Sequence, residues 1–184
     1  SQNKNFLTGV ATDSHRLSSS KIEIDDNLKF DPLILPKKTV FQLSNLLEET
    51  NEKILIQTSD NKILFKIGKI KLISKVIDGK FPDYRKVVPQ GNNKTLTVAS
   101  KDFVQAIERV TSVSLDRKEG VKLVLNKDNI KLSVNSTNSG EGNEIIKANF
   151  TSDEMTVSFN SKYLIDVANS IEDKNLKINL KDPV

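Results

Sequence analysis

The chain has 184 residues with 28 Lys and Arg against 24 Asp and Glu, a formal net charge of +4, and 36% hydrophobic residues. It contains no cysteine, which excludes disulfides, thiolate catalysis and Cys-ligated zinc and fits a reducing compartment. No apolar run is long enough to predict a membrane-spanning helix, and the length suits one large domain or two small ones.

The first half of the chain predicts strands around a single helix. The strands are expected from short apolar or alternating runs at 6–11, 20–24, 33–36, 53–59, 62–67 and 69–76. Asp60 and Asn61 predict a tight turn between two of them. A helix is predicted over 37–49, following Pro36, with one apolar stripe made of Val40, Phe41, Leu43, Leu46 and Leu47.

The run "DGKFPDYRKVVPQGNNK" at 78–94 is typical of a connector, because it holds two prolines and two glycines. Its residues Phe81, Tyr84, Val87 and Val88 are too apolar for a purely flexible linker. Either they are buried in a neighbouring core, or the connector is rigid and adds side chains to a groove at a domain junction.

The second half predicts more strands and two helices. The strands are expected at 95–100, 121–126, 130–136, 144–150, 155–160 and 176–180. Helices are predicted over 100–113 and 161–171, with Ser100 and Ser161 as their N-caps. The spacing in the first of them predicts that Phe103, Val104, Ile107 and Val110 pack on one side. The runs "TLTVASKDFVQAI" and "MTVSFNSKYLIDV" share one pattern at a spacing of about 60 residues, which predicts a repeated strand–helix–strand unit. The fold class is therefore α+β.

The run "VATDSHRLSSS" at 10–20 brings together Asp13, Ser14 and the only histidine, His15. Three adjacent residues do not form a catalytic triad by themselves, because triad side chains converge through folding. No nucleophile-elbow, metal-binding or phosphate-loop motif is present, so we predict no metal and no cofactor. A hydrolase using Asp13 and His15 stays an alternative, as does a scaffold or adhesion β-protein that binds no DNA.

Lysines recur in the first turn of each predicted helix, at Lys37, Lys38, Lys101 and Lys162. If the repeated units are symmetric, these lysines line one surface that suits DNA phosphates. The alternative is that they are merely solvated. Only four arginines occur, which favours non-specific backbone contact over base reading, although an AT-rich genome would enrich lysine as well.

Several motifs in one order resemble a known family, the bacterial sliding clamps, which are the beta subunits of DNA polymerase III. "VATDSHRL" resembles the family's "ATDGHRL", and "DGKFPDYRKVVP" resembles its inter-domain signature. "EGVKLVL" and "FNSKYLIDVANSI" are similar to later segments. The resemblance implies a DNA-clamp fold of repeated β-α-β-β-β units, with antiparallel sheets outside and helices lining a ring.

The same resemblance implies a function and a domain plan. Residues 1–82 would be the later part of the middle clamp domain, 83–93 a connector, and 94–184 the C-terminal domain without its last strands. The protein would be a cytoplasmic, non-catalytic processivity factor, whose homodimeric ring encircles duplex DNA without sequence specificity. It would tether the polymerase III alpha subunit, the clamp loader and repair polymerases through short linear peptides, and no membrane is involved.

The resemblance also assigns a peptide-binding groove in this numbering. Its members are expected to be Thr12, Ser14, His15, Arg16, Leu17, Pro82, Val87 and Val184. Leu17, Val87 and Val184 offer apolar pockets, while the polar residues around them fix the register of a bound peptide. Ser14 stands where the family usually has Gly, so the turn is expected to differ slightly in shape.

Overall fold

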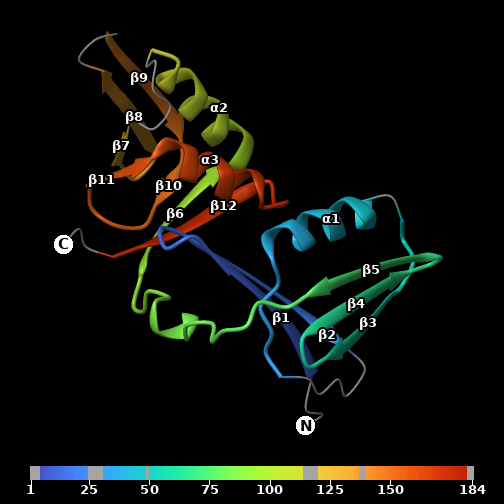
Figure 1. Cartoon of the computed structure of the whole chain (residues 1–184). Coiled ribbons are helices and arrows are strands. Elements are labelled where there is room, and N and C mark those ends of the chain that lie inside the picture. The colour runs from blue at the N-terminus through green and yellow to red at the C-terminus, as the bar shows by residue number, and fades with distance from the viewer. Residues whose placement is uncertain (1–4, 25–30, 49, 114–119, 137–139, 182–184) are drawn as a thin grey trace. The chain divides into compact units, whose positions relative to one another are not determined.

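A computed structural model describes residues 5–24, 31–48, 50–113, 120–136 and 140–181, and Figure 1 shows its trace. The chain divides into two compact units, residues 1–87 and residues 88–184. No helix in the described ranges is long and apolar enough to cross a membrane.

The described residues of the unit 1–87 form two antiparallel sheets and one long helix. A hairpin pairs β1 with β2, and a three-stranded sheet has the order β3-β4-β5, so β4 is its central strand. The elements are β1 (Asn5–Thr12), β2 (Leu17–Ile24), α1 (Lys37–Glu48), β3 (Ile54–Ser59), β4 (Lys62–Ile67), β5 (Ile70–Lys75) and the 3₁₀ turn η1 (Tyr84–Lys86). Asp60 and Asn61 form the predicted turn between β3 and β4.

The three-stranded sheet has one buried face, as its alternating sequence predicts. Ile63, Phe65 and Ile67 of β4 are each at most 4% exposed. Helix α1 covers this face, because Thr39 of α1 is buried and its Oγ1 lies 2.7 Å from the Oγ of Ser74 in β5. The intervening residues of each strand point to the opposite, solvated face.

One prediction for this unit was wrong, and another holds only in part. Residues 33–36 do not form a strand: Ile34 makes a single bridge to Ile77, because Pro32 and Pro36 flank a run too short for a ladder. The predicted apolar stripe of α1 is only partly covered. Its members Leu43, Leu46 and Leu47 are half-buried, whereas Val40 is 49% exposed and Phe41 is 59% exposed.

Within residues 88–184, the described ranges form two sheets and two helices. The sheets have the strand orders β10-β6-β12 and β11-β7-β8-β9. The elements are β6 (Lys94–Ala99), α2 (Ser100–Thr111), β7 (Gly120–Leu125), β8 (Asn129–Ser136), β9 (Gly140–Lys147), β10 (Asn149–Phe150), β11 (Met155–Asn160), α3 (Ser161–Asn169) and β12 (Asn175–Leu180).

The predicted repeat appears as a reciprocal exchange of strands. β6 leads into α2 and pairs with β12, the strand after α3; β11 leads into α3 and pairs with β7, the strand after α2. The two strand–helix–strand copies thus complete each other's sheets. Helices α2 and α3 pack together, and α2 also packs on β8 and β9. The core of this unit contains Phe103, Ile107 and Val110 of α2, as the helical spacing predicts.

Three local predictions in this unit were wrong. Ser100 does not cap α2, because its hydroxyl donates to the carbonyl of Asp173 at 2.8 Å, beyond the end of α3. Ser161 is buried inside the first turn of α3, and Asn160 is the N-cap, accepting from the backbone of Lys162. Residues 144–150 are not one strand: β9 ends at Lys147 on β8, and β10 pairs with β6 in the other sheet.

Candidate functional site

The run that the sequence singled out forms the turn of the β1–β2 hairpin. Thr12 and Leu17 are its last paired residues. The hydroxyl of Thr12 donates to the carbonyl of Arg16 at 2.8 Å and accepts from the backbone N–H of Ser14 at 3.2 Å. Thr12, Ser14 and His15 are exposed, while Arg16 and Leu17 are half-buried. The turn therefore presents polar groups beside one partly covered leucine.

Asp13 organises this turn. Its Oδ1 accepts hydrogen bonds from the backbone N–H groups of His15 at 3.1 Å and Arg16 at 3.0 Å. Its Oδ2 accepts from the Arg16 Nε at 3.0 Å, which makes an ion pair. The backbone hydrogen bond from Arg16 is the main cause that lowers the pKa of Asp13. These bonds hold the carboxylate on the backbone of its own turn, which is the role of an Asx-turn residue and not that of a catalytic base.

Ser14 adopts a backbone φ of +75°, and no other non-glycine residue in the described ranges has a positive φ. This left-handed conformation favours glycine, because a Cβ atom crowds the neighbouring carbonyl. Ser14 therefore adopts a backbone conformation that suits glycine, the residue that the family named above usually has at this position.

The other predicted groove residues lie on the connector. Pro82 is exposed and immediately precedes Asp83, the N-cap of η1, whose carboxylate accepts from the backbone N–H of Arg85 at 3.3 Å. Val87 follows η1 as its C-cap and is 67% exposed. Residues 84–87 are thus held in a short turn that presents an apolar side chain to solvent. Val184 lies outside the described residues.

The predicted DNA-facing lysines all sit in first helical turns. Lys37 and Lys38 begin α1, Lys101 is the second residue of α2, and Lys162 is the second residue of α3. All four are exposed. The Nζ of Lys37 stands 5.5 Å from the centre of the Phe41 ring, a cation–π contact.

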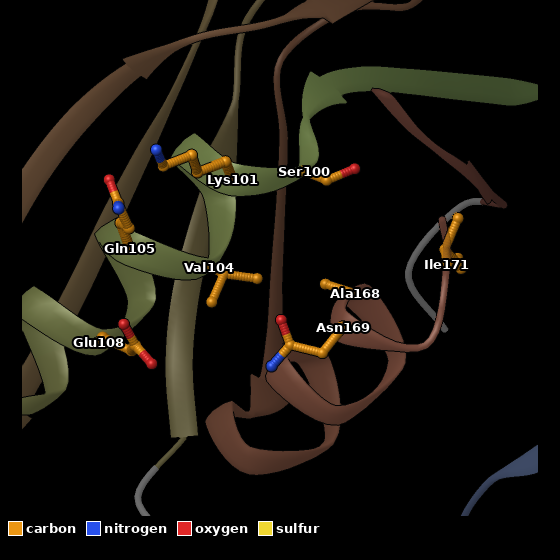
Figure 2. A pocket seen from close by; sticks show the side chains of 8 residues that line it. All are labelled: Ser100, Lys101, Val104, Gln105, Glu108, Ala168, Asn169 and Ile171. Atoms are coloured by element: carbon orange, nitrogen blue, oxygen red, sulfur yellow. The ribbon is translucent and has the colours of Figure 1, made fainter. Parts of the chain in front are cut away.

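A hollow lies between α2 and α3, and Figure 2 shows the side chains that surround it. Val104 and Ala168 face each other across it, with Lys101 and Glu108 on α2 and Asn169 on α3. Its lining residues are Ser100, Lys101, Val104, Gln105, Glu108, Ala168, Asn169 and Ile171. The hollow brings one cation and one anion to the surface of the helix pair and holds no pair of carboxylates for acid–base chemistry.

No group of three or more His, Cys, Asp or Glu residues that could hold a metal ion occurs within the described part of the chain.

The predicted set of groove residues omits Asp13, although the side chain of Asp13 organises the turn. The spacing of Asp13 and Arg16, three residues apart around a serine and a histidine, was the available signal for an Asx turn closed by an ion pair.

Strand–helix–strand units that complete each other's antiparallel sheets, as in residues 88–184, are typical of an α+β protein of the DNA-clamp type. Two family models match the chain: the DNA polymerase III beta subunit, central domain, over residues 1–83, and the C-terminal domain of the same subunit over residues 85–184. The chain therefore belongs to the DNA polymerase III beta subunit family, the sliding clamps.

Individual relatives agree with this assignment. The beta sliding clamp of Caulobacter vibrioides strain NA1000 is 34% identical over 178 residues, which cover 96% of this chain and 48% of the relative. The beta sliding clamp of Escherichia coli K12 is 32% identical over 178 residues, which cover 97% of this chain and 49% of the relative. The chain thus spans about half the length of the relatives it matches.

Solved structures give the same result for the fold. The crystal structure of the beta subunit sliding clamp from Bartonella birtlesii LL-WM9 superposes with a TM-score of 0.91 at 37% identity, covering 98% of this chain and 52% of that one. A structure of the B. birtlesii clamp bound to griselimycin superposes with a TM-score of 0.90.

Proposed function

We propose that this chain is the central and C-terminal part of a processivity factor for DNA replication. The observation that carries the proposal is the match of both units to consecutive domains of one sliding-clamp subunit. In the complete protein, two subunits form a ring around duplex DNA, slide on it without reading its sequence, and tether the polymerase. The ring is retained by its topology, so strong attraction to DNA is not needed and a modest net charge is sufficient. The protein acts in the cytoplasm and is not itself an enzyme.

The DNA contact is assigned to the first-turn lysines Lys37, Lys38, Lys101 and Lys162. Their exposure leaves the ammonium groups accessible to phosphates. Lysine is a point charge without the planar fork that reads bases, so these residues would attract the DNA backbone without fixing a register. Such contacts weaken as salt concentration rises, because bound counterions are released from the DNA.

Peptide docking is assigned to the β1–β2 turn and the connector. Leu17 and Val87 supply apolar surface, and the groups around them, Thr12, Ser14, His15, Arg16 and Pro82, set the register of a bound segment. Val184 completes the proposed set. The partners would be the polymerase III alpha subunit, the clamp loader and repair polymerases. A short peptide buries little area, and an affinity on the order of micromolar would allow partners to exchange.

The docking assignment is tested by fluorescence anisotropy with a labelled peptide of the Gln-x-x-Leu-Phe type. The protein is a clamp of the relatives' full length that carries this chain. We expect saturable binding that the double variant Leu17→Ala, Val87→Ala loses by at least about tenfold, or about 1.4 kcal/mol. The matched control is Ile145→Ala, which removes an apolar side chain 65% exposed on β9. Absence of peptide binding, or equal loss in the control, would refute the groove.

A further inference from the structure

The outer face of the three-stranded sheet carries an unusual arrangement of charge. β3, β4 and β5 contain four lysines and no acidic residue. Because Ile63, Phe65 and Ile67 are buried under α1, the alternate residues Lys62 and Lys66 project from the opposite face. We call this surface the lysine face; it consists of Leu55, Gln57, Ser59, Lys62, Leu64, Lys66, Lys71, Ile73 and Lys75.

The strand register sets the lysines in directly opposed pairs. Lys62 faces Lys75, and Lys66 faces Lys71, with Leu64 facing Ile73 between the two pairs. Directly opposed side chains have Cβ atoms about 5 Å apart, a spacing at which like charges repel. All four lysines are exposed, and none of them forms an ion pair with a residue in the described ranges.

Protection of a sheet edge does not account for this arrangement. Lysines on edge strands discourage pairing with other chains, and this explanation suits Lys71 and Lys75 on β5. β4, however, is the central strand, paired on both sides, so Lys62 and Lys66 have no edge to protect. The outer face of the β11-β7-β8-β9 sheet differs: Lys122 faces Ser133 and Ser158, and Lys131 faces Val124 and Ile145.

We propose that the lysine face is a docking surface for an acidic peptide segment of a partner protein, bound in an extended conformation. The two lysine pairs are four residues apart along the strands, or about 13 Å, with the Leu64–Ile73 pair halfway. An extended segment places residues i, i+2 and i+4 on one face at the same spacing. The matching segment therefore has acidic residues at i and i+4 and an apolar residue at i+2.

The chemistry of the face favours a peptide over other anionic partners. It has no arginine and no aromatic ring, the groups that read and stack on nucleic-acid bases. It also lacks the aromatic residues that insert into a membrane interface. Ile73 is 63% exposed, and it would lie against phosphates in a nucleic-acid complex but against a side chain in a peptide complex. None of these residues belongs to the set proposed above for peptide docking or DNA contact.

The test uses the whole chain and a fluorescein-labelled peptide with the core Glu-Thr-Leu-Thr-Glu. A scrambled peptide of the same composition, a single-stranded oligonucleotide and vesicles of anionic lipid serve as competitors. Titrations are run at 0.01 M and 0.1 M ionic strength, over which the Debye length falls from about 30 Å to about 10 Å. We expect saturable binding that weakens with salt and is stronger than that of the scrambled peptide.

The variants separate the lysine face from net charge. Replacing Lys62, Lys66, Lys71 and Lys75 by Gln should weaken binding at least about tenfold, or about 1.4 kcal/mol. The matched variant replaces the exposed Lys122, Lys131, Lys147 and Lys177 by Gln, none of which faces a lysine, and should change binding less than about twofold. Circular dichroism checks that both variants fold.

Binding of the core peptide with these preferences supports the proposal. No binding, equal loss in the two lysine variants, or equal affinity for the scrambled peptide would overturn it. Tighter binding of the oligonucleotide or the vesicles, lost in the Lys62, Lys66, Lys71 and Lys75 variant, would assign the face to a different class of partner and would also overturn it.

Discussion

Residues 1–87 and residues 88–184 have similar lengths and similar amphipathic patterns, yet they bury their apolar side chains very differently. Of the 19 fully buried hydrophobic residues in the described ranges, 16 form one cluster in the unit of residues 88–184. Among the described residues of the other unit, only Ile63, Phe65 and Ile67 are buried to this degree. Conversely, the part of the chain that the structure describes exposes 15 large hydrophobic residues, and 10 of them lie in residues 1–87. The apolar stripe of an element therefore indicates which face can be buried. Whether that face is buried depends on the elements that pack against it.

Charge divides between the units as well. Residues 1–87 hold 15 Lys and Arg against 11 Asp and Glu, while residues 88–184 hold 13 of each. The whole formal net charge of +4 thus lies in the first unit. The net charge of the whole chain does not show this difference between the units. The lysine face contains four lysines, the same number as the excess of positive charge in residues 1–87.

The largest expected effect comes from breaking the core of residues 88–184. Phe103→Ala should lower the free energy of unfolding by about 3–5 kcal/mol, because it leaves a cavity where the side chain is 1% exposed. Phe41→Ala in α1 should cost less than about 1 kcal/mol, since that ring is 59% exposed and loses mainly its contact with Lys37. Urea unfolding followed by circular dichroism measures both. Equal losses would show that the two units do not differ in packing.

A gain in stability is expected at the β1–β2 turn. Ser14→Gly should raise the free energy of unfolding by up to about 1 kcal/mol, because glycine has no Cβ atom to be crowded at this positive φ. Ser19→Gly, in the middle of β2, should lower it by about 0.5–1 kcal/mol through lost backbone entropy. Amide exchange of the hairpin checks the sign at each position. A loss at Ser14 comparable with that at Ser19 would mean that the serine side chain stabilises the turn.

The smallest expected effect is a pH dependence in residues 88–184. The Arg109 guanidinium makes two hydrogen bonds to the Glu144 carboxylate, at 3.0 and 2.6 Å, and these lower the pKa of Glu144 from its ordinary 4.5. A lowered folded-state pKa contributes stability that is present above pH 4.5 and is lost as the pH falls through the folded-state pKa. The pair joins α2 to β9 near the surface, so solvent screens it and the effect is small.

Acid unfolding of Glu144→Gln against the parent chain measures this contribution. The variant should lose only the part of the pH dependence below pH 4.5 that Glu144 contributes, as followed by amide exchange in α2 and β9. Asp13→Asn is the counterpart in residues 1–87, because Asp13 also has a lowered pKa and an amide keeps an oxygen for the backbone bonds. An unchanged acid profile in Glu144→Gln would show that the ion pair adds nothing in solution.

The sequence by itself determined the local elements and the family. Alternation placed β4 and β5 nearly to the residue, and helical spacing identified Phe103, Ile107 and Val110 of α2 as core. "VATDSHRL" and "DGKFPDYRKVVP" carry the resemblance to the sliding clamps, and the family models confirm it. These features depend on neighbours along the chain, so they can be read from a short window.

Only the tertiary structure decided which segments meet. Residues 144–150 look like one strand but divide between two sheets, and Ser100 bonds to the segment after α3 instead of capping α2. The pairing of Lys62 with Lys75 depends on the register of β4 and β5, and the exposure of Phe41 depends on what covers α1. Periodicity fixes which side of an element is apolar, whereas register, caps and burial depend on contacts between residues far apart in sequence.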